Sequence, residues 1–204
     1  MIIEKNDVVL FQGDSITFAG RNLDDGADMG RGYAMMAAAL FSATYPDHGV
    51  QFINRGIGSN TVMDLRDRWQ ADCLDLNPSV VSILIGINDI WRDINVGEFE
   101  TTCRSLLKST RETTGARFIL IEPFLLPGPE NYAEKRVLLA AEIDIIRKLA
   151  WEFEARLVPA DGLFAAEYGR REQGFWIDPQ DGVHPTSAGH ALLAQAWLRN
   201  TGAL

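Results

Sequence analysis

Cysteine, histidine and basic side chains are scarce in this sequence, and each scarcity excludes a class of protein. The 204 residues include two cysteines and three histidines. Both cysteines, Cys73 and Cys103, fall within predicted helices, which favours free thiols in a reducing compartment over a disulfide framework. Lys and Arg number 19 against 28 Asp and Glu, so the net charge of −9 repels a phosphate backbone. We therefore expect no nucleic-acid partner.

Long apolar runs are missing as well. None approaches the roughly 18 residues that a membrane span needs, and the first residues, MIIEKNDVVL, contain acidic side chains and lack the apolar centre of a secretory signal. We expect a cytoplasmic protein with no membrane association. With 47% apolar and 23% charged residues, the composition is that of a globular protein. The length suits one domain, residues 1–204, with a core of its own.

Short apolar runs alternate along the chain with longer segments of helical periodicity. The runs predict strands at Val8 to Phe11, Val50 to Ile53, Val80 to Ile85, Phe118 to Ile121 and Leu157 to Val158. The longer segments predict helices at Tyr33 to Tyr45, Thr61 to Leu74, Glu98 to Thr114, Ala133 to Phe153 and Ser187 to Leu198. Strands that are apolar throughout indicate a parallel sheet covered by helices on both faces. The predicted fold class is α/β.

Polar side chains gather in four loops that this fold would place at one edge of the sheet. Ligands of an open parallel sheet bind outside the carboxyl ends of its strands. Three of the loops follow predicted strands and the fourth precedes the last helix. They are Gly13-Asp14-Ser15, Asn54 to Asn60, Gly86 to Asp89 and Asp181 to His184.

The pattern of Ser15, Asp181 and His184 fits nucleophilic catalysis. A serine hydroxyl needs a base such as histidine to accept its proton near neutral pH. Asp181 lies three residues before His184, close enough in a bent loop to hold one imidazole nitrogen. Taken singly, each residue also has a structural interpretation, since Ser15 could cap a helix and the Asp–His pair could stabilise a turn. His48 and His190 are interpreted as structural.

A nucleophile of this kind also needs hydrogen-bond donors for the oxyanion that forms during the reaction. The backbone N–H of Ser15 lies at a predicted helix N-terminus. The loop NRGIGSN contains two glycines, which permit outward-pointing amides. Asn88 supplies a neutral side-chain amide. These three places are the candidate donors.

Four sequence blocks resemble those of the SGNH, or GDSL, hydrolase family, and they occur in the family's order. The blocks are GDSI at 13–16, NRGIGSN at 54–60, GIND at 86–89 and DGVHP at 181–185. The longer stretches NRGIGSNTVMDLRDRW and SILIGINDIWRD further resemble the bacterial acetylxylan esterases of that family. The resemblance implies a flavodoxin-like, three-layer αβα sandwich around a parallel sheet of about five strands.

The resemblance also assigns roles to individual residues. Ser15 would be the nucleophile, His184 the general base and then acid, and Asp181 the residue that orients His184. The side-chain amide of Asn88 and the backbone N–H of Ser15 would donate to the oxyanion. Family members usually have glycine where this chain has Ser59. The third donor would therefore be the Ser59 N–H, with Gly58 as the alternative.

No metal or organic cofactor is required for this chemistry, since one imidazole with scattered carboxylates lacks the usual spacing of metal ligands. The implied partner is a small ester substrate, an acetylated xylose or xylo-oligosaccharide. Base rates for soluble enzymes favour a homo-oligomer. Sugar contacts are assigned to the side chains Tyr33, Trp91, Arg92 and Trp176, although aromatic residues at helical spacing are more often part of a core.

Two other functions remain open from the residues. A short-chain carboxylesterase or thioesterase, or a lipase of the lysophospholipase type, would use the same catalytic side chains. A carbohydrate-binding or scaffold protein without activity would keep the fold alone. Replacement of Ser15 by alanine separates the enzymes from the inactive scaffold.

Overall fold

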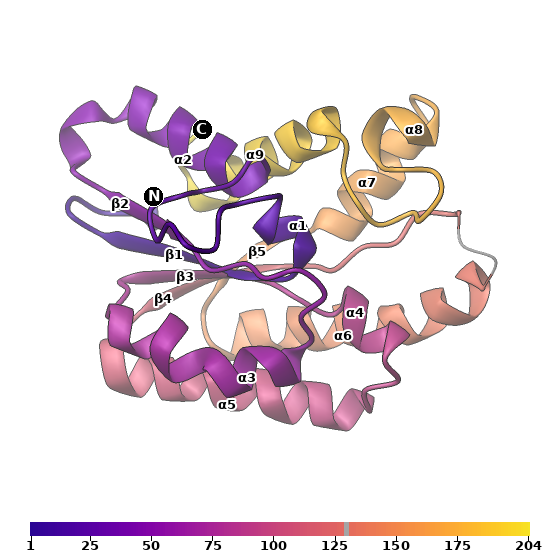
Figure 1. Ribbon diagram of the computed structural model, residues 1–204, viewed down its shortest axis with the longest axis horizontal. Coiled ribbons are helices and arrows are strands. Elements are labelled where there is room, and N and C mark those ends of the chain that lie inside the picture. The colour runs from indigo at the N-terminus through magenta and orange to yellow at the C-terminus, as the bar shows by residue number, and fades with distance from the viewer. Residues whose placement is uncertain (129–130) are drawn as a thin grey trace.

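A five-stranded sheet lies at the centre of the computed structural model, which describes residues 1–128 and 131–204 (Figure 1). The strand order is β2-β1-β3-β4-β5 and every pair is parallel. This is the flavodoxin-like order. The strands are β1 (Val8–Gly13), β2 (Gln51–Asn54), β3 (Val80–Leu84), β4 (Arg117–Ile121) and β5 (Arg156–Val158). The predicted α/β class is confirmed.

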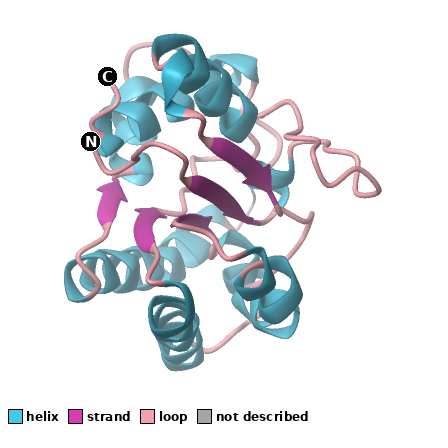
Figure 2. Cartoon of the chain, turned by 90° about the vertical axis from the view of Figure 1, so that its left-hand side faces the viewer, coloured by secondary structure: helices cyan, strands magenta, loops and turns pink. Residues whose placement is uncertain are grey.

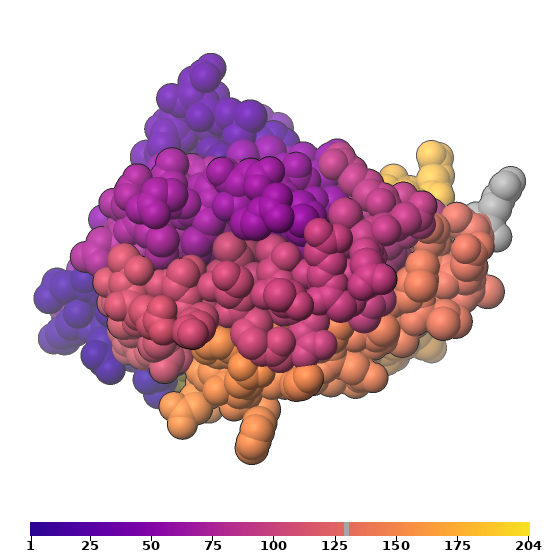
Figure 3. Space-filling model, turned by 90° about the horizontal axis from the view of Figure 1, so that it is seen from below, coloured from indigo at the N-terminus to yellow at the C-terminus, as the bar shows by residue number. Residues whose placement is uncertain are grey.

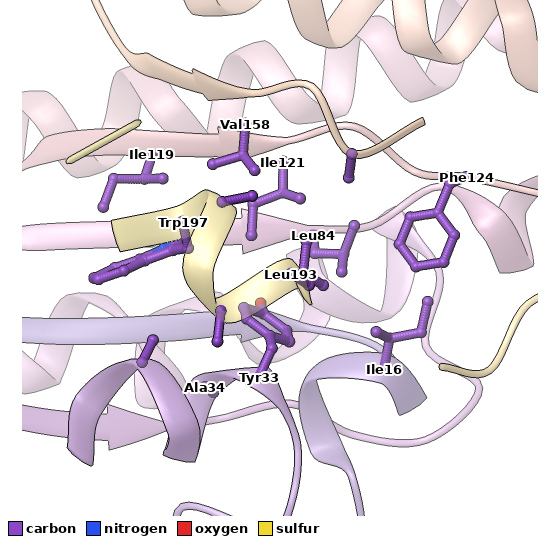
Figure 4. Packing of buried hydrophobic residues seen from close by; sticks show 14 of the residues in the cluster. Ile16, Tyr33, Ala34, Leu84, Ile119, Ile121, Phe124, Val158, Leu193 and Trp197 are labelled. Atoms are coloured by element: carbon purple, nitrogen blue, oxygen red, sulfur yellow. The ribbon is translucent and has the colours of Figure 1, made fainter. Parts of the chain in front are cut away.

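Helices cover both faces of the sheet, which explains why its central strands are apolar throughout (Figure 2). All five residues of β3 are buried. One layer contains α1 (Ser15–Phe18), α2 (Tyr33–Thr44), α7 (Ala160–Tyr168), α8 (Gln173–Trp176) and α9 (Ser187–Thr201). Its core includes Trp197 (Figure 4). This side chain packs on Phe11 with 5.2 Å between ring centroids and donates its indole N–H to Ser82 Oγ at 3.0 Å.

The opposite layer contains α3 (Val62–Asp72), α5 (Val96–Thr114) and α6 (Tyr132–Glu152). Figure 3 views the molecule from this side, with α3 and α5 across its centre. Trp69 of α3 donates its indole N–H to Thr110 Oγ1 of α5 at 2.9 Å. The short α4 (Ile87–Trp91) packs against α6. The remaining elements are two 3₁₀ turns, Pro46–His48 and Leu74–Leu76.

The observed elements follow the sequence pattern closely, with differences at the ends. The last helix runs past Leu198 to Thr201 and ends where Gly202 adopts a left-handed conformation. The helix expected from Glu98 begins at Val96, because Asn95 accepts the Gly97 N–H. Helices α4, α7 and α8 were not predicted. Helix α7 follows Pro159 and contains Gly162, both of which are typical of loops.

The helices also bear on the predictions about free cysteines and membrane spans. Cys73 and Cys103 are buried and carry free thiols, as the sequence predicts. Within residues 1–128 and 131–204, none of the helices combines the length and the apolar character that crossing a membrane requires.

Candidate active site

The turn after β1 presents Ser15 at the carboxyl edge of the sheet. Gly13 ends β1 with φ 157°, and any side chain there would collide with the Leu84 carbonyl oxygen and the Thr17 hydroxyl. Asp14 is the N-cap of α1, and its Oδ1 accepts the Ile16 N–H at 2.9 Å. Because Asp14 caps the helix, the Ser15 hydroxyl is free for another partner.

That partner is His184. Ser15 Oγ lies 2.8 Å from His184 Nε2, and His184 Nδ1 lies 2.7 Å from Asp181 Oδ2. The structure thus brings together three side chains separated by up to 169 residues in one hydrogen-bonded chain. The loop that carries the histidine is held by the Asp178 N–H, which donates to the His184 carbonyl at 2.9 Å.

Asp181 is held as a carboxylate. Partial burial acts to raise its pKa, but hydrogen bonds from the His184 N–H, the His184 ring and the Val183 N–H outweigh it, so that the pKa lies below its usual value. Oδ1 accepts the Val183 N–H at 2.8 Å and the His184 N–H at 3.0 Å. A carboxylate fixed in this way orients the imidazole and stabilises its protonated form.

Two of the expected oxyanion donors lie on neighbouring segments. Asn88, in α4, donates one N–H of its side-chain amide to the Asn60 carbonyl at 3.0 Å. An amide NH₂ has two donors, so the second N–H stays available for a substrate. Ser59 precedes Asn60 and has φ 62°, in the left-handed region that favours glycine. Gly58 lies in the same turn, so its N–H remains the alternative donor.

Two buried carboxyl groups lie next to these segments. Burial raises the pKa of Asp14 to about 7 and that of Asp89 to about 7. Asp89 Oδ1 accepts the Val62 N–H at 2.9 Å and so connects α4 to the start of α3. Within residues 1–128 and 131–204, no group of three or more His, Cys, Asp or Glu side chains could hold a metal ion.

A shallow depression of about 290 Å³ lies beside His184. Its lining includes Trp91, Asn88, Val183 and Gln180. The Lys135 ammonium covers one face of the Trp91 ring at 5.4 Å from the centroid. Trp91 thus lies beside His184, and the sugar contact assigned to it stays a prediction. Gln180 was not among the sequence candidates, and its only signal is its place next to Asp181.

The other candidates for sugar contacts lie elsewhere. Arg92 is half-exposed and pairs with Asp64 at 3.6 Å. Trp176 donates its indole N–H to the Glu167 carbonyl at 3.1 Å and lines a separate depression with Phe175.

The contact predicted for Tyr33 is wrong. Its side chain is 0% exposed and lies among buried hydrophobic residues (Figure 4). Its hydroxyl lies 3.1 Å from Thr17 Oγ1. Tyr33 begins α2 and packs edge-on against Phe11 at 5.8 Å between centroids. It belongs to the core because β1 and α9 cover it from the sheet side, which the polar residues preceding it in the sequence did not indicate.

The comparisons with known proteins agree with this geometry. The model of the GDSL-like Lipase/Acylhydrolase family matches residues 11–192. The chain belongs to this family. As a GDSL hydrolase it is a carboxylic ester hydrolase, and the family predicted from the four sequence blocks is confirmed.

Individual relatives match nearly the whole chain. An acetylxylan esterase of Geobacillus stearothermophilus is 34% identical over 220 residues, which cover 99% of this chain and 97% of that protein. The crystal structure of a catalytic mutant of an acetylxylan esterase from the same organism has a TM-score of 0.90 at 33% identity, covering 99% of this chain and 97% of that chain. An alpha/beta hydrolase enzyme from the metagenome of Lake Arreo, Spain, has a TM-score of 0.91 at 30% identity, covering 100% and 99%.

Proposed function

We propose that this GDSL hydrolase is a serine esterase that removes acetyl groups from acetylated sugars. The observation that carries the proposal is the hydrogen-bonded chain from Ser15 through His184 to Asp181, with distances of 2.8 and 2.7 Å. A hydroxyl, an imidazole and a carboxylate in this order are the groups that acyl transfer through a serine needs. These three side chains lie at an exposed edge of the sheet, where an ester can approach.

The reaction proceeds in two steps. Ser15 Oγ attacks the ester carbonyl carbon while its proton passes to His184 Nε2, and Asp181 stabilises the imidazolium that forms. The Ser15 N–H, the Ser59 N–H and the free amide N–H of Asn88 donate to the oxyanion. His184 then protonates the leaving sugar oxygen as the C–O bond breaks. A water molecule, activated by His184, attacks the acyl-enzyme and releases acetate and Ser15.

Two observations support an acetylated sugar as the substrate. The relative at 34% identity is an acetylxylan esterase, and a second structure of similar likeness is that of an acetyl-xylooligosaccharide esterase. The depression beside His184 is open and shallow, and the partly buried Trp91 lines it, an aromatic side chain of the kind that packs against a sugar ring. A short acyl group suits a depression of about 290 Å³.

Acetate release tests the reaction. Acetylated xylo-oligosaccharides are incubated with the wild-type protein, with Ser15→Ala and with Ser42→Ala, a matched control at an exposed serine of α2. Loss of a triad serine removes the nucleophile, so we expect kcat to fall at least about 1,000-fold in Ser15→Ala and to stay unchanged in the control. Retained activity in Ser15→Ala would contradict the proposed nucleophile.

A substrate panel tests the acyl and alcohol preferences. It contains acetylated xylose, acetylated xylo-oligosaccharides, p-nitrophenyl esters of two to eight carbons, a long-chain acyl thioester and a lysophospholipid. We expect the highest kcat/KM for the acetylated saccharides. A higher value for the long-chain thioester or the lysophospholipid would replace the sugar esterase by a thioesterase or lipase that uses the same triad.

A further inference from the structure

Arg68 is the charged residue of α3 that reaches from this helix to the active-site turns. Its side chain is 15% exposed, and its guanidinium makes four hydrogen bonds. Nε donates to Asn60 Oδ1 at 2.8 Å, and Nη2 donates to the Gly13 carbonyl at 3.3 Å. Nη1 donates to Gln12 Oε1 at 2.9 Å and to Asp72 Oδ2 at 3.0 Å.

Two of these partners adjoin the proposed catalytic groups. Gly13 lies two residues before Ser15 and ends β1. Asn60 directly follows Ser59, and its carbonyl accepts the Asn88 amide at 3.0 Å. The Arg68 guanidinium therefore connects the end of β1, which precedes Ser15, with Asn60. Asn60 follows one proposed oxyanion donor, the Ser59 N–H, and its carbonyl binds another, the Asn88 amide.

Backbone hydrogen bonds connect the first half of the oxyanion turn, residues 54–60, to β1. The Arg55 N–H donates to the Phe11 carbonyl at 2.8 Å. The Ile57 N–H donates to the Gly13 carbonyl at 3.1 Å. Between Ile57 and Asn60 the backbone passes through the left-handed conformation of Ser59. The bond from Arg68 to the Asn60 side chain thus fixes the far end of the turn relative to the same Gly13 carbonyl.

We propose that Arg68 is a positioning residue for the oxyanion hole: through Asn60 it sets the place of the Asn88 amide relative to Ser15. The proposal rests on the proposed esterase function. Oxyanion donors act only when they are held where charge develops, and a displacement of about 1 Å can cost about 100-fold in rate. A planar guanidinium with donors in a fixed fork can hold two segments in one geometry, whereas a lysine ammonium is a single point on a flexible stem.

The first experiment compares substitutions on one helix. Arg68→Lys and Arg68→Met are measured beside Arg66→Lys and Arg66→Met, whose parent residue is half-exposed on the same helix and pairs with Asp67. We expect Arg68→Lys to lower kcat for an acetyl ester by about 10- to 100-fold with KM within about threefold, and the Arg66 variants to match the wild type. An unchanged kcat in Arg68→Lys would overturn the proposal.

A second comparison separates positioning from fold stability. Asp72→Asn weakens the ion pair of Arg68 with Asp72 but leaves the bonds to Gly13 and Asn60 in place. We expect a lower Tm with kcat retained. If Asp72→Asn lowered kcat as strongly as Arg68→Lys, the effect would come from the ion pair and the proposal would be wrong. Should Arg68→Lys fail to fold, Asn60→Ala, which removes the acceptor and keeps Arg68, carries the same kinetic expectation.

A double-mutant cycle tests the route. If Arg68 acts through the Asn88 amide, the fold-decrease in kcat that Arg68→Lys causes should be at least ten times smaller in an Asn88→Ala background than in the wild type. Equal losses in both backgrounds would contradict this route.

A wild-type protein without activity on any ester of the panel would contradict the proposed function itself. An active wild type with an unaffected Arg68→Lys would contradict the role of Arg68 alone.

Discussion

Asp14 caps helix α1, which leaves the Ser15 hydroxyl free to bind His184. The Asp14 carboxylate caps α1 through the Ile16 N–H, and the Ser15 hydroxyl points to His184. A serine that capped the helix would have its oxygen committed to a backbone donor. At the scale of single residues, the neighbour of the serine therefore decides that the hydroxyl is available for chemistry.

Ser59 is the second residue whose local conformation bears on the reaction. Its φ of 62° is a conformation that costs a non-glycine residue about 1 kcal/mol or more. The proposed donor at this position is the backbone N–H, which does not depend on the side chain. Activity should therefore tolerate a change of side chain as long as the backbone conformation is kept.

Substitutions at Ser59 should follow that rule. We expect Ser59→Gly to keep kcat for an acetyl ester within about threefold and to match or slightly exceed the wild-type Tm, because glycine adopts this φ without strain. Ser59→Val should lower both kcat and Tm, since a β-branched residue is an outlier at positive φ. Steady-state kinetics and thermal unfolding measure the two effects. A Ser59→Val variant that equals Ser59→Gly in both would show that the backbone geometry here is unimportant.

At the scale of elements, the start of α3 determines where the oxyanion turn ends. Thr61 Oγ1 accepts the Asp64 N–H at 3.3 Å, and Asp64 Oδ2 accepts the Thr61 N–H at 2.7 Å. This capping box occupies two of the free donors of the first helical turn. Asp89 of α4 accepts a third, the Val62 N–H. The helix that carries Arg68 is thus anchored next to Asn60.

Removal of the cap should destabilise the fold measurably. We expect Thr61→Ala to lower the free energy of unfolding by about 1 kcal/mol, which corresponds to a Tm decrease of about 2 to 4 °C for a chain of this size. Thr101→Ala, at an exposed threonine inside α5, is the matched control and should stay within about 0.5 kcal/mol of the wild type. Chemical denaturation of both variants measures the difference. Equal stabilities would rule out the cap as a source of stability.

At the scale of the whole molecule, one buried carboxyl group couples folding to pH. Glu142 of α6 is 0% exposed, and a Cβ at Gly86, the N-cap of α4, would lie 2.6 Å from its Oε2. Among residues 1–128 and 131–204 neither of its oxygens has a hydrogen-bond partner. Burial, together with the charge of Asp89, raises the pKa of Glu142 to about 9. The group is therefore protonated in the folded protein at neutral pH.

The pH dependence of stability follows from this shift. The ordinary pKa of a glutamate side chain is 4.5, whereas the pKa of Glu142 in the folded chain is about 9, so between these values the folded state binds the extra proton. The contribution of Glu142 to stability is then greatest at low pH and decreases by up to about 1.4 kcal/mol per pH unit as the pH rises through this window. Glu142→Gln removes the titration.

We therefore expect the Tm of Glu142→Gln minus that of the wild type to increase steadily from pH 5 to pH 9. Thermal unfolding in a series of buffers of equal ionic strength measures it. Glu134→Gln, at an exposed position of the same helix, is the control and should give a difference that does not change with pH. A constant difference for Glu142→Gln as well would mean that this carboxyl group is not protonated in the fold.

Local patterns in the sequence were sufficient for the fold class and for the family. The apolar runs from Val8, Val80 and Phe118 became strands because a parallel sheet covered on both faces requires them to be apolar throughout. Local patterns were insufficient for Tyr33, which follows polar and glycine residues yet is fully buried. They were also insufficient for Arg68: its spacing to Asp72 predicts an ion pair within the helix, but its bonds to Gln12 and Gly13 span 56 and 55 residues.

The sequence by itself determined which side chains could react and which loops would share one edge of the sheet, because residue type and hydrophobic period are local properties. Only the tertiary structure decided that Ser15 Oγ lies 2.8 Å from His184 Nε2, that Asp14 rather than Ser15 caps α1, and that Arg68 connects β1 to the oxyanion turn. Distances between residues so far apart in the chain depend on strand order and on how α3 and α9 pack against the sheet, and no local pattern encodes those.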